Sequence, residues 1–169
     1  INLSCDKVII DVRSPSEYLK AHIPGAINLP LFTDEERAVV GTLYKQQSRE
    51  EAIKAGLDYF GPRMRTMVEE AERIANCAGS PGGKTLMVHC WRGGMRSSGV
   101  AWLLDLYGFN VYTLEGGYKA FRNYVLNTFE REHKIKLLGG YTGSGKTGLL
   151  HRMSKEGHSV IDLEGLASH

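Results

Sequence analysis

Short apolar runs and amphipathic segments alternate along the first three quarters of the chain. The apolar runs predict buried strands at residues 7–11, 85–88 and 111–114, and a tight turn within residues 22–29 leads into a further short strand. Capping signals and helical periodicity predict helices at residues 15–21, 33–46, 48–55, 63–75, 98–107 and 118–130. This alternation predicts an α/β fold with a parallel sheet flanked by helices, whose functional sites lie beyond the carboxyl ends of the strands.

The predicted first domain covers residues 1–130 and contains a helical insertion at about residues 31–84. Several cations in this insertion could contact a polyanion, namely Lys45, Arg49, Lys54, Arg63 and Arg65. They are interleaved with glutamate and aspartate, so a solvated helix face is the default interpretation.

A second region follows the charged connector at residues 130–134. A strand is predicted at residues 135–139, and the phosphate-loop pattern G-x-x-x-x-G-K-[ST] follows at residues 140–147. We then predict a helix that closes near Gly157 and another strand at residues 159–162. Loop N–H groups would wrap a phosphate and Lys146 would reach its outer oxygens, while Thr147 could hold Mg²⁺. The residues of this expected site are Gly140, Gly143, Ser144, Gly145, Lys146 and Thr147. Residues 134–169 are too few to bury a full core, so we expect the N-terminal fragment of a P-loop NTPase-like domain.

Composition narrows the class of protein only modestly. A formal net charge of +2 over 169 residues permits nucleic-acid contact without arguing for it. No apolar run approaches the roughly 20 residues that span a bilayer, and no secretory signal opens the sequence, so we expect no membrane association. Three irregularly spaced cysteines, Cys5, Cys77 and Cys90, argue against a disulfide framework and a Cys-rich zinc site, and favour a reducing cytoplasm.

The candidate chemistry centres on Cys90, which follows a predicted strand and precedes a glycine-containing loop and a helix. Backbone N–H groups of such a loop and the helix dipole converge on one point and stabilise negative charge there. A thiol at that point should be largely thiolate at neutral pH. The arginines of the loop add fixed positive charge suited to an oxyanion. We predict a nucleophilic Cys90 in an anion-binding cradle made by Arg92, Gly93, Gly94, Met95 and Arg96.

Several chemistries fit this cradle. The spacing Cys90-x5-Arg96 is that of cysteine-dependent phosphatases, whose thiolate attacks phosphorus, but these need a general acid and we find no strong candidate. A thiolate that accepts sulfur or selenium from an anionic donor is equally compatible, and a non-catalytic module that docks an anion or tRNA is a third alternative. Asp11 and His22 are further catalytic candidates, although hydrogen bonding of strand ends and turns is the favoured role for both.

Three segments resemble the signatures of the rhodanese family. Residues 11–18 and 22–26 are similar to its two N-terminal signatures, residues 114–121 are similar to its C-terminal signature, and Cys90 aligns with its sulfur-carrying cysteine. The resemblance implies a rhodanese-like fold. Ordinary sulfurtransferases of this family have Cys-x4-Arg, whereas this loop is one residue longer, as in rhodanese-fold phosphatases.

A rhodanese domain with this loop, a helical insertion and a following phosphate loop together resemble the bacterial tRNA 2-selenouridine synthase family. The resemblance implies replacement of sulfur by selenium in tRNA that carries 2-thiouridine at the wobble position. Selenophosphate and geranyl diphosphate would be substrates, an S-geranyl-2-thiouridine would be the intermediate, and no tightly bound cofactor is expected. By the same resemblance Cys90 is the essential thiol, Arg92 and Arg96 hold selenophosphate, and the loop at residues 140–147 binds a diphosphate or the tRNA backbone.

Overall fold

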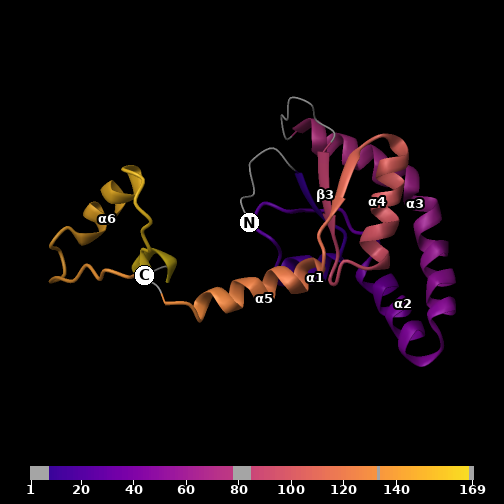
Figure 1. The fold of residues 1–169 in the computed structure, drawn as a ribbon, viewed down its shortest axis with the longest axis horizontal. Coiled ribbons are helices and arrows are strands. Elements are labelled where there is room, and N and C mark those ends of the chain that lie inside the picture. The colour runs from indigo at the N-terminus through magenta and orange to yellow at the C-terminus, as the bar shows by residue number, and fades with distance from the viewer. Residues whose placement is uncertain (1–7, 78–84, 133, 168–169) are drawn as a thin grey trace. The chain divides into compact units, whose positions relative to one another are not determined.

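The computed structural model describes residues 8–77, 85–132 and 134–167 (Figure 1). The chain divides into two compact units, Ile1–Glu130 and Arg131–His169. No helix in the described ranges is long and apolar enough to cross a membrane. In chain order the elements are β1 (Val8–Asp11), α1 (Pro15–Lys20), β2 (Ile27–Asn28), α2 (Asp34–Gln46), α3 (Arg49–Cys77), β3 (Thr85–His89), α4 (Met95–Tyr107), β4 (Asn110–Thr113), α5 (Gly117–Phe129), α6 (Lys146–Lys155) and α7 (Leu163–Leu166).

The first unit is built on a parallel sheet with strand order β2-β1-β3-β4. β1 lies beside β3 with Ile10 opposite Val88, and β3 lies beside β4 with Val88 opposite Thr113. The strands predicted from the apolar runs are confirmed within a few residues, and β2 occupies the predicted place after the turn. Because all strands run in the same direction, their carboxyl ends meet at one edge, where Asp11 and His89 lie opposite each other.

Alternating side chains along the strands enter two separate cores. Ile10 and Val88 belong to the larger core, which is closed by residues of α3 and α4 such as Phe60. Ile9 points into the smaller core, together with Tyr118 at the start of α5. Figure 1 shows α3 and α4 running along the same side of the sheet. The sheet is therefore covered on both faces, as parallel sheets require.

Helix α3 corrects one prediction. We expected two helices, at residues 48–55 and 63–75, whereas α3 runs unbroken from Arg49 to Cys77 with Pro62 inside it. A proline in a helix interior costs about 3 kcal/mol because it lacks an N–H and crowds the preceding turn. Arg63 donates to Glu36 of α2 at 2.6 and 2.9 Å directly after the proline. The apolar face then continues into the core on both sides of Pro62, with Ala52, Phe60, Met67, Ala71, Ile74 and Ala75 buried.

The second unit contains the predicted loop and helix, but the strands predicted at residues 135–139 and 159–162 are not formed in the described residues. A strand needs a hydrogen-bonded neighbour, and a two-stranded parallel pair without a covering layer is weak. Every described residue of this unit is exposed or partly exposed, so no core stabilises such a pair. Helix α6 nevertheless begins at Lys146, directly after Gly145 in the left-handed conformation.

Candidate active site

Cys90 lies at the carboxyl edge of the sheet, between the end of β3 and the start of α4. The backbone N–H of Val12 donates to the His89 carbonyl at 3.0 Å, which fastens the end of β3 to the segment after β1. Gly94 precedes α4 as its N-cap residue, and Met95 is the first residue of the helix. The structure therefore brings the predicted loop residues around one buried thiol, whose residue is 3% exposed.

Hydrogen bonds surround the Cys90 sulfur. The Gly94 N–H donates to Sγ at 3.3 Å, and the Ser97 hydroxyl lies 3.3 Å from Sγ. Burial by itself would raise the pKa of the Cys90 thiol, but hydrogen bonds from the Ser97 hydroxyl and from the Ser97, Arg92 and Gly94 N–H groups lower it below the ordinary value. These donors stabilise the thiolate, which is the nucleophilic form.

The start of α5 holds the cradle loop in shape. The Tyr118 N–H donates to the Cys90 carbonyl at 2.9 Å, and the Lys119 N–H donates to the Trp91 carbonyl at 2.9 Å. Gly93 and Gly117 both have positive φ, +66° and +58°, and a side chain on Gly117 would lie 2.6 Å from the Gly93 nitrogen. Only glycine allows two backbones to approach this closely in that conformation.

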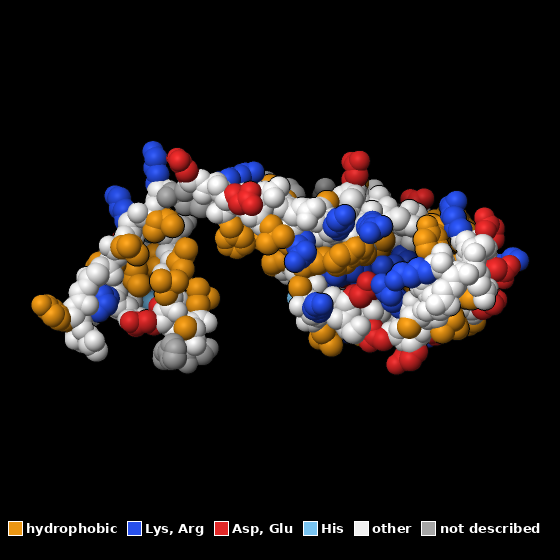
Figure 2. Space-filling view, turned by 90° about the horizontal axis from the view of Figure 1, so that it is seen from below, with side chains coloured by type: hydrophobic (Ala, Val, Ile, Leu, Met, Phe, Trp, Pro, Cys, Tyr) orange, Lys and Arg blue, Asp and Glu red, His pale blue; other side chains and the backbone are white. Residues whose placement is uncertain are grey.

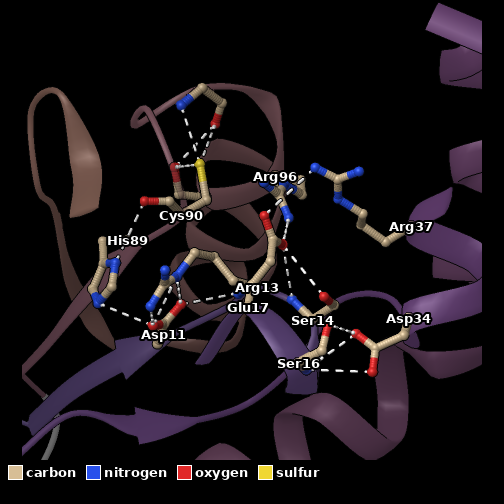
Figure 3. Close-up of polar contacts among 12 residues, drawn as sticks. Asp11, Arg13, Ser14, Ser16, Glu17, Asp34, Arg37, His89, Cys90 and Arg96 are labelled. Atoms are coloured by element: carbon tan, nitrogen blue, oxygen red, sulfur yellow. Dashed lines mark hydrogen bonds and ion pairs between the residues drawn. The ribbon is translucent and has the colours of Figure 1, made fainter. Parts of the chain in front are cut away.

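The two arginines of the cradle differ in their partners. Arg96 Nη1 donates to Glu17 Oε2 at 2.7 Å, and both side chains are largely buried. Arg92 is exposed and its guanidinium forms no ion pair with any other residue that the structure describes. Figure 3 shows Cys90 and Arg96 above the β1–α1 segment, with Glu17 bound to Arg96. Arg92 is thus available to an incoming anion, whereas Arg96 is held by a carboxylate.

Glu17 is a component of the site that the sequence alone did not reveal, because its position three residues after Ser14 marks it only as a capping residue of α1. It does accept a hydrogen bond from the Ser14 N–H at 3.2 Å, as the capping box predicts. Burial by itself would raise its pKa, but Arg96, Ser14 and Arg37 lower it below the usual range. Ser97 was also missed as a functional residue. Its position directly after Arg96 was the only available signal.

The insertion is tied to α1 at the same place. Asp34, the first residue of α2, accepts hydrogen bonds from the Ser16 N–H at 3.1 Å and from the Ser16 hydroxyl at 2.6 Å. Arg37 Nη2 lies 3.7 Å from Glu17 Oε1. Figure 3 shows the Arg37 and Arg96 guanidinium groups approaching Glu17 from two elements. Helices α1, α2 and α4 therefore meet through side chains beside the cradle.

Asp11 and His22 have structural roles, which is the interpretation the sequence favoured. Asp11 is fully buried and accepts from Arg13 Nη2 at 2.6 Å, while the Arg13 guanidinium lies 4.0 Å from the centre of the Tyr118 ring. His22 stacks on the Tyr18 ring with a centroid distance of 4.0 Å. Neither side chain makes a described contact with the Cys90 sulfur.

His89 is buried directly before Cys90. Burial lowers its pKa, so the imidazole is neutral at physiological pH. Its Nδ1 lies 3.4 Å from the Cys90 carbonyl, and its Nε2 has no hydrogen-bond partner among the described residues. The ring therefore packs beneath the cradle and contacts the loop backbone.

Most cations of the insertion are engaged within it. Lys54 pairs with Glu51 at 2.7 Å and Arg65 with Glu69 at 2.8 Å, which agrees with solvated helix faces. Arg49 differs, because its Nη2 lies 3.9 Å from the sulfur of Met95 in the cradle.

The phosphate loop of the second unit has a shape suited to anions. Its three glycines, Gly140, Gly143 and Gly145, all have positive φ. Lys146 Nζ donates to the carbonyls of Gly140 and Tyr141 at 3.0 and 2.9 Å, so the lysine folds over the loop. Ser144 and Thr147 are exposed. Within the described ranges, no group of three or more His, Cys, Asp or Glu side chains could hold a metal ion.

Asp162, at the end of the segment predicted as a strand, makes its described contacts with His151 and with Gly165. Its carboxylate lies 3.6 Å from His151 Nε2 of α6 and accepts from the Gly165 N–H at the start of α7. Its hydrogen bond from Gly165 lowers its pKa, and His151 lowers it further.

The sequence matches two family models. Residues 2–124 match the rhodanese-like domain, and residues 133–169 match the tRNA 2-selenouridine synthase AAA domain. The chain is 42% identical over 166 residues to the tRNA 2-selenouridine synthase of Serratia proteamaculans (strain 568), which covers 97% of this chain and 42% of that protein. It is 39% identical over 173 residues to the protein of the same name from Nitrosomonas europaea, with coverage of 97% and 42%. The chain thus spans about two fifths of the length of these curated relatives.

Among solved structures, the N-terminal domain of a protein from Clostridium difficile 630 is 43% identical to this chain. It superposes with a TM-score of 0.65 and covers 72% of this chain and 90% of that domain.

Proposed function

We propose that this chain, which belongs to the rhodanese-like domain family, is part of a tRNA-modifying enzyme that replaces sulfur by selenium in wobble 2-thiouridine. The observation that carries the proposal is the buried Cys90 thiol of lowered pKa in a loop of N–H donors. The match of residues 133–169 to the AAA domain of tRNA 2-selenouridine synthase supports the choice of substrate. Such a substrate implies a cytoplasmic enzyme.

The proposed exchange proceeds through an S-geranyl intermediate and is redox-neutral. The sulfur of 2-thiouridine attacks geranyl diphosphate, a carbon–sulfur bond forms, and diphosphate leaves. Selenium from selenophosphate then bonds to C2 of the base, and the sulfur leaves as geranyl thiol. Water cleaves the remaining selenium–phosphorus bond and releases phosphate, which leaves selenium on the base.

The cradle residues receive roles from their geometry. Cys90 is the proposed essential thiol of the selenium step, because its sulfur lies at the centre of the cradle that would bind selenophosphate. Arg92 is exposed and unpaired among the described residues, so it would bind the oxygens of selenophosphate together with loop N–H groups. Arg96 would join them only by sharing its guanidinium with Glu17. Gly93, Gly94 and Met95 complete the proposed anion site.

The phosphate loop would hold the second anion. Its positive-φ glycines, the exposed Ser144 and the N-terminus of α6 suit a diphosphate or a tRNA phosphate. Lys146 would leave the Gly140 carbonyl to reach the outer oxygens, and Thr147 offers a hydroxyl to Mg²⁺ accompanying a diphosphate.

The full-length protein provides the test. We expect wild-type protein to convert 2-thiouridine tRNA to the selenium form with selenophosphate and geranyl diphosphate, and we expect Cys90→Ser to abolish this conversion while tRNA still binds. Cys77→Ser is the matched control, because Cys77 is an exposed thiol at the end of α3. Unchanged selenation by Cys90→Ser would refute the catalytic role.

A phosphatase is the main alternative, since the Cys90-x5-Arg96 spacing is compatible with it. Glu17 is the carboxylate bound to Arg96, and its lowered pKa keeps it ionised at neutral pH, so it is poorly suited to protonate a leaving group. Thiosulfate discriminates the two chemistries. A sulfur acceptor forms a bond from Sγ to the terminal sulfur, the sulfur–sulfur bond of thiosulfate breaks, and sulfite leaves. Intact mass would show that adduct, whereas phosphate release from an aryl phosphate without an adduct would support the phosphatase.

A further inference from the structure

We propose that Arg37 and Arg49 of the helical insertion, which we call the insertion rim, bind backbone phosphates of the tRNA beside Cys90. The inference rests on the proposed function and names a contact surface for its RNA substrate. It assigns a role to the insertion, which otherwise only covers one face of the sheet.

Both rim arginines contact residues of the cradle region. Arg37, in α2, lies 3.7 Å from Glu17, which binds Arg96 of the cradle. Arg49, the first residue of α3, lies 3.9 Å from the sulfur of Met95. Figure 2 shows Lys and Arg side chains gathered in and around a hollow of the first unit. The insertion therefore brings two guanidinium groups from different helices to the neighbourhood of one site.

The rim arginines are less neutralised than the other arginines of the insertion. Arg63, Arg65 and Arg73 each have a carboxylate within 2.8 Å, contributed by Glu36, Glu69 and Glu70. Arg49 forms no ion pair with a described residue. The carboxylate nearest to Arg37 is 3.7 Å away and already accepts a 2.7 Å hydrogen bond from Arg96. The two arginines of the insertion with the least neutralised charge are thus the two that contact the cradle region.

Helix stability does not explain the position of Arg49. A cation at the first residue of a helix faces the positive end of the helix dipole, which is unfavourable. The adjacent Glu50 and Glu51 are the residue type that this end favours. Arg49 instead extends its side chain to Met95, which is 51% exposed at the start of α4. An anionic ligand at this place would offset the unfavourable interaction with the dipole.

The chemistry of the rim fits the RNA backbone. Guanidinium groups present paired N–H donors that match phosphate oxygens. A wobble nucleotide whose base reaches Cys90 brings its flanking phosphates to the edge of the cradle, where the rim lies. Selenophosphate is also a phosphate anion, but the loop N–H groups and Arg92 already supply a site for it within the cradle.

Binding of the full-length protein to 2-thiouridine tRNA, measured over a range of salt concentrations, tests the proposal. We expect Arg37→Gln/Arg49→Gln to weaken binding about tenfold at moderate salt and to reduce the slope of log affinity against log salt by about one to two. Formation of the thiosulfate adduct on Cys90 should be unchanged. The matched control is Arg65→Gln/Arg73→Gln, which removes the same charge from the same helical insertion and should have little effect. Circular dichroism and thermal unfolding verify that all variants fold.

Three outcomes would overturn the proposal. Equal losses in the rim and control variants would mean that only overall charge matters. A loss of thiosulfate-adduct formation with unchanged tRNA binding would show that the rim binds the small anionic donor and not the tRNA. Unaltered tRNA affinity and salt slope in the rim variant would show that the insertion rim does not bind the tRNA. None of these outcomes depends on selenation. A failure of the proposed activity would appear in the Cys90→Ser experiment instead, so it can be told apart from a failure of the rim proposal.

Discussion

Glu17 and Arg96 are 79 residues apart in the sequence, yet Arg96 Nη1 donates to Glu17 Oε2 at 2.7 Å. This ion pair joins the first helix of the fold to the first turn of the helix that follows Cys90. It also makes the two arginines of the proposed anion cradle unequal, because Arg96 already has a carboxylate partner and Arg92 has none among the described residues. An incoming oxyanion must either rely on Arg92 or share Arg96 with Glu17.

Glu17→Gln should lower the free energy of unfolding by about 1–2 kcal/mol at neutral pH, because Arg96 loses a charged acceptor in a largely buried place. The pKa of Glu17 is lower in the folded protein than in the unfolded chain. The carboxylate therefore contributes fully to the free energy of unfolding above the unfolded-state pKa, and this contribution is lost as the pH falls through the folded-state pKa. Urea unfolding at neutral and acidic pH measures this, and the difference from wild type should shrink in acid.

Glu69→Gln is the control for that measurement, since Glu69 pairs with Arg65 on an exposed helix face. Its unfolding free energy should match that of wild type. A Glu17→Gln protein whose stability deficit persists unchanged in acid would contradict the assigned role of the carboxylate.

Ser97→Ala should raise the pKa of the Cys90 thiol, because it removes the hydroxyl that lies 3.3 Å from Sγ. A lowered pKa means that the thiolate persists to lower pH, so alkylation of Cys90 should begin at a more acidic pH in wild type than in the variant. The rate of iodoacetamide labelling against pH, followed by peptide mass spectrometry, gives both midpoints.

Ser98→Ala tests the specificity of that effect, because Ser98 is exposed on the same helical turn. Its labelling profile should coincide with that of wild type. Coincident profiles for wild type and Ser97→Ala would show that the Ser97 hydroxyl does not stabilise the thiolate.

Gly117→Ala should destabilise the first unit by about 3 kcal/mol or more, since the added methyl would clash with the Cys90 carbonyl and lie 2.6 Å from the Gly93 nitrogen at a positive φ. Gly61→Ala is the opposite case. Gly61 lies within α3 with nothing near its added methyl, so alanine should stabilise the helix by about 0.5–1 kcal/mol. Thermal melts of both variants should shift in opposite directions, and a shift in the same direction would contradict the packing described.

Asp11→Asn should destabilise the protein by about 3–5 kcal/mol, because it leaves the buried Arg13 guanidinium without its carboxylate. The loss should appear in the unfolding free energy at neutral pH. Glu70→Gln, which breaks the exposed pair with Arg73, provides the comparison and should unfold like wild type. Equal stability of Asp11→Asn and wild type would show that the buried pair is not structural.

Much of the local structure could be predicted from the sequence. The apolar runs identified the central strands β1 and β3 because most of their side chains are buried on both faces of the parallel sheet. Capping signals marked the start of α1 and the end of α4, where the structure has the Ser14–Glu17 capping box and the Gly108 C-cap, because such residues satisfy backbone groups at helix ends. The strand–Cys90–glycine loop–helix order was sufficient to predict a stabilised thiolate, since that order places backbone donors around the sulfur.

Other features depended on packing between distant segments. The sequence predicted two helices at residues 48–55 and 63–75, but the apolar face of α3 and the Arg63–Glu36 contact keep the helix continuous through Pro62. The strands expected in the second unit had the right side chains but no neighbours with which to pair. Secondary structure of this kind depends on tertiary partners that a local pattern does not contain.

The sequence by itself determined where the proposed nucleophile lies and what kind of loop surrounds it, because those properties follow from residues adjacent in the chain. Only the tertiary structure decided that Arg96 is held by Glu17, that Ser97 faces the thiol and that Gly117 closes on Gly93. These relationships join α1, α4 and α5 across long sequence separations. The short-range patterns that specify helices and strands do not specify which side chains meet once those elements pack together.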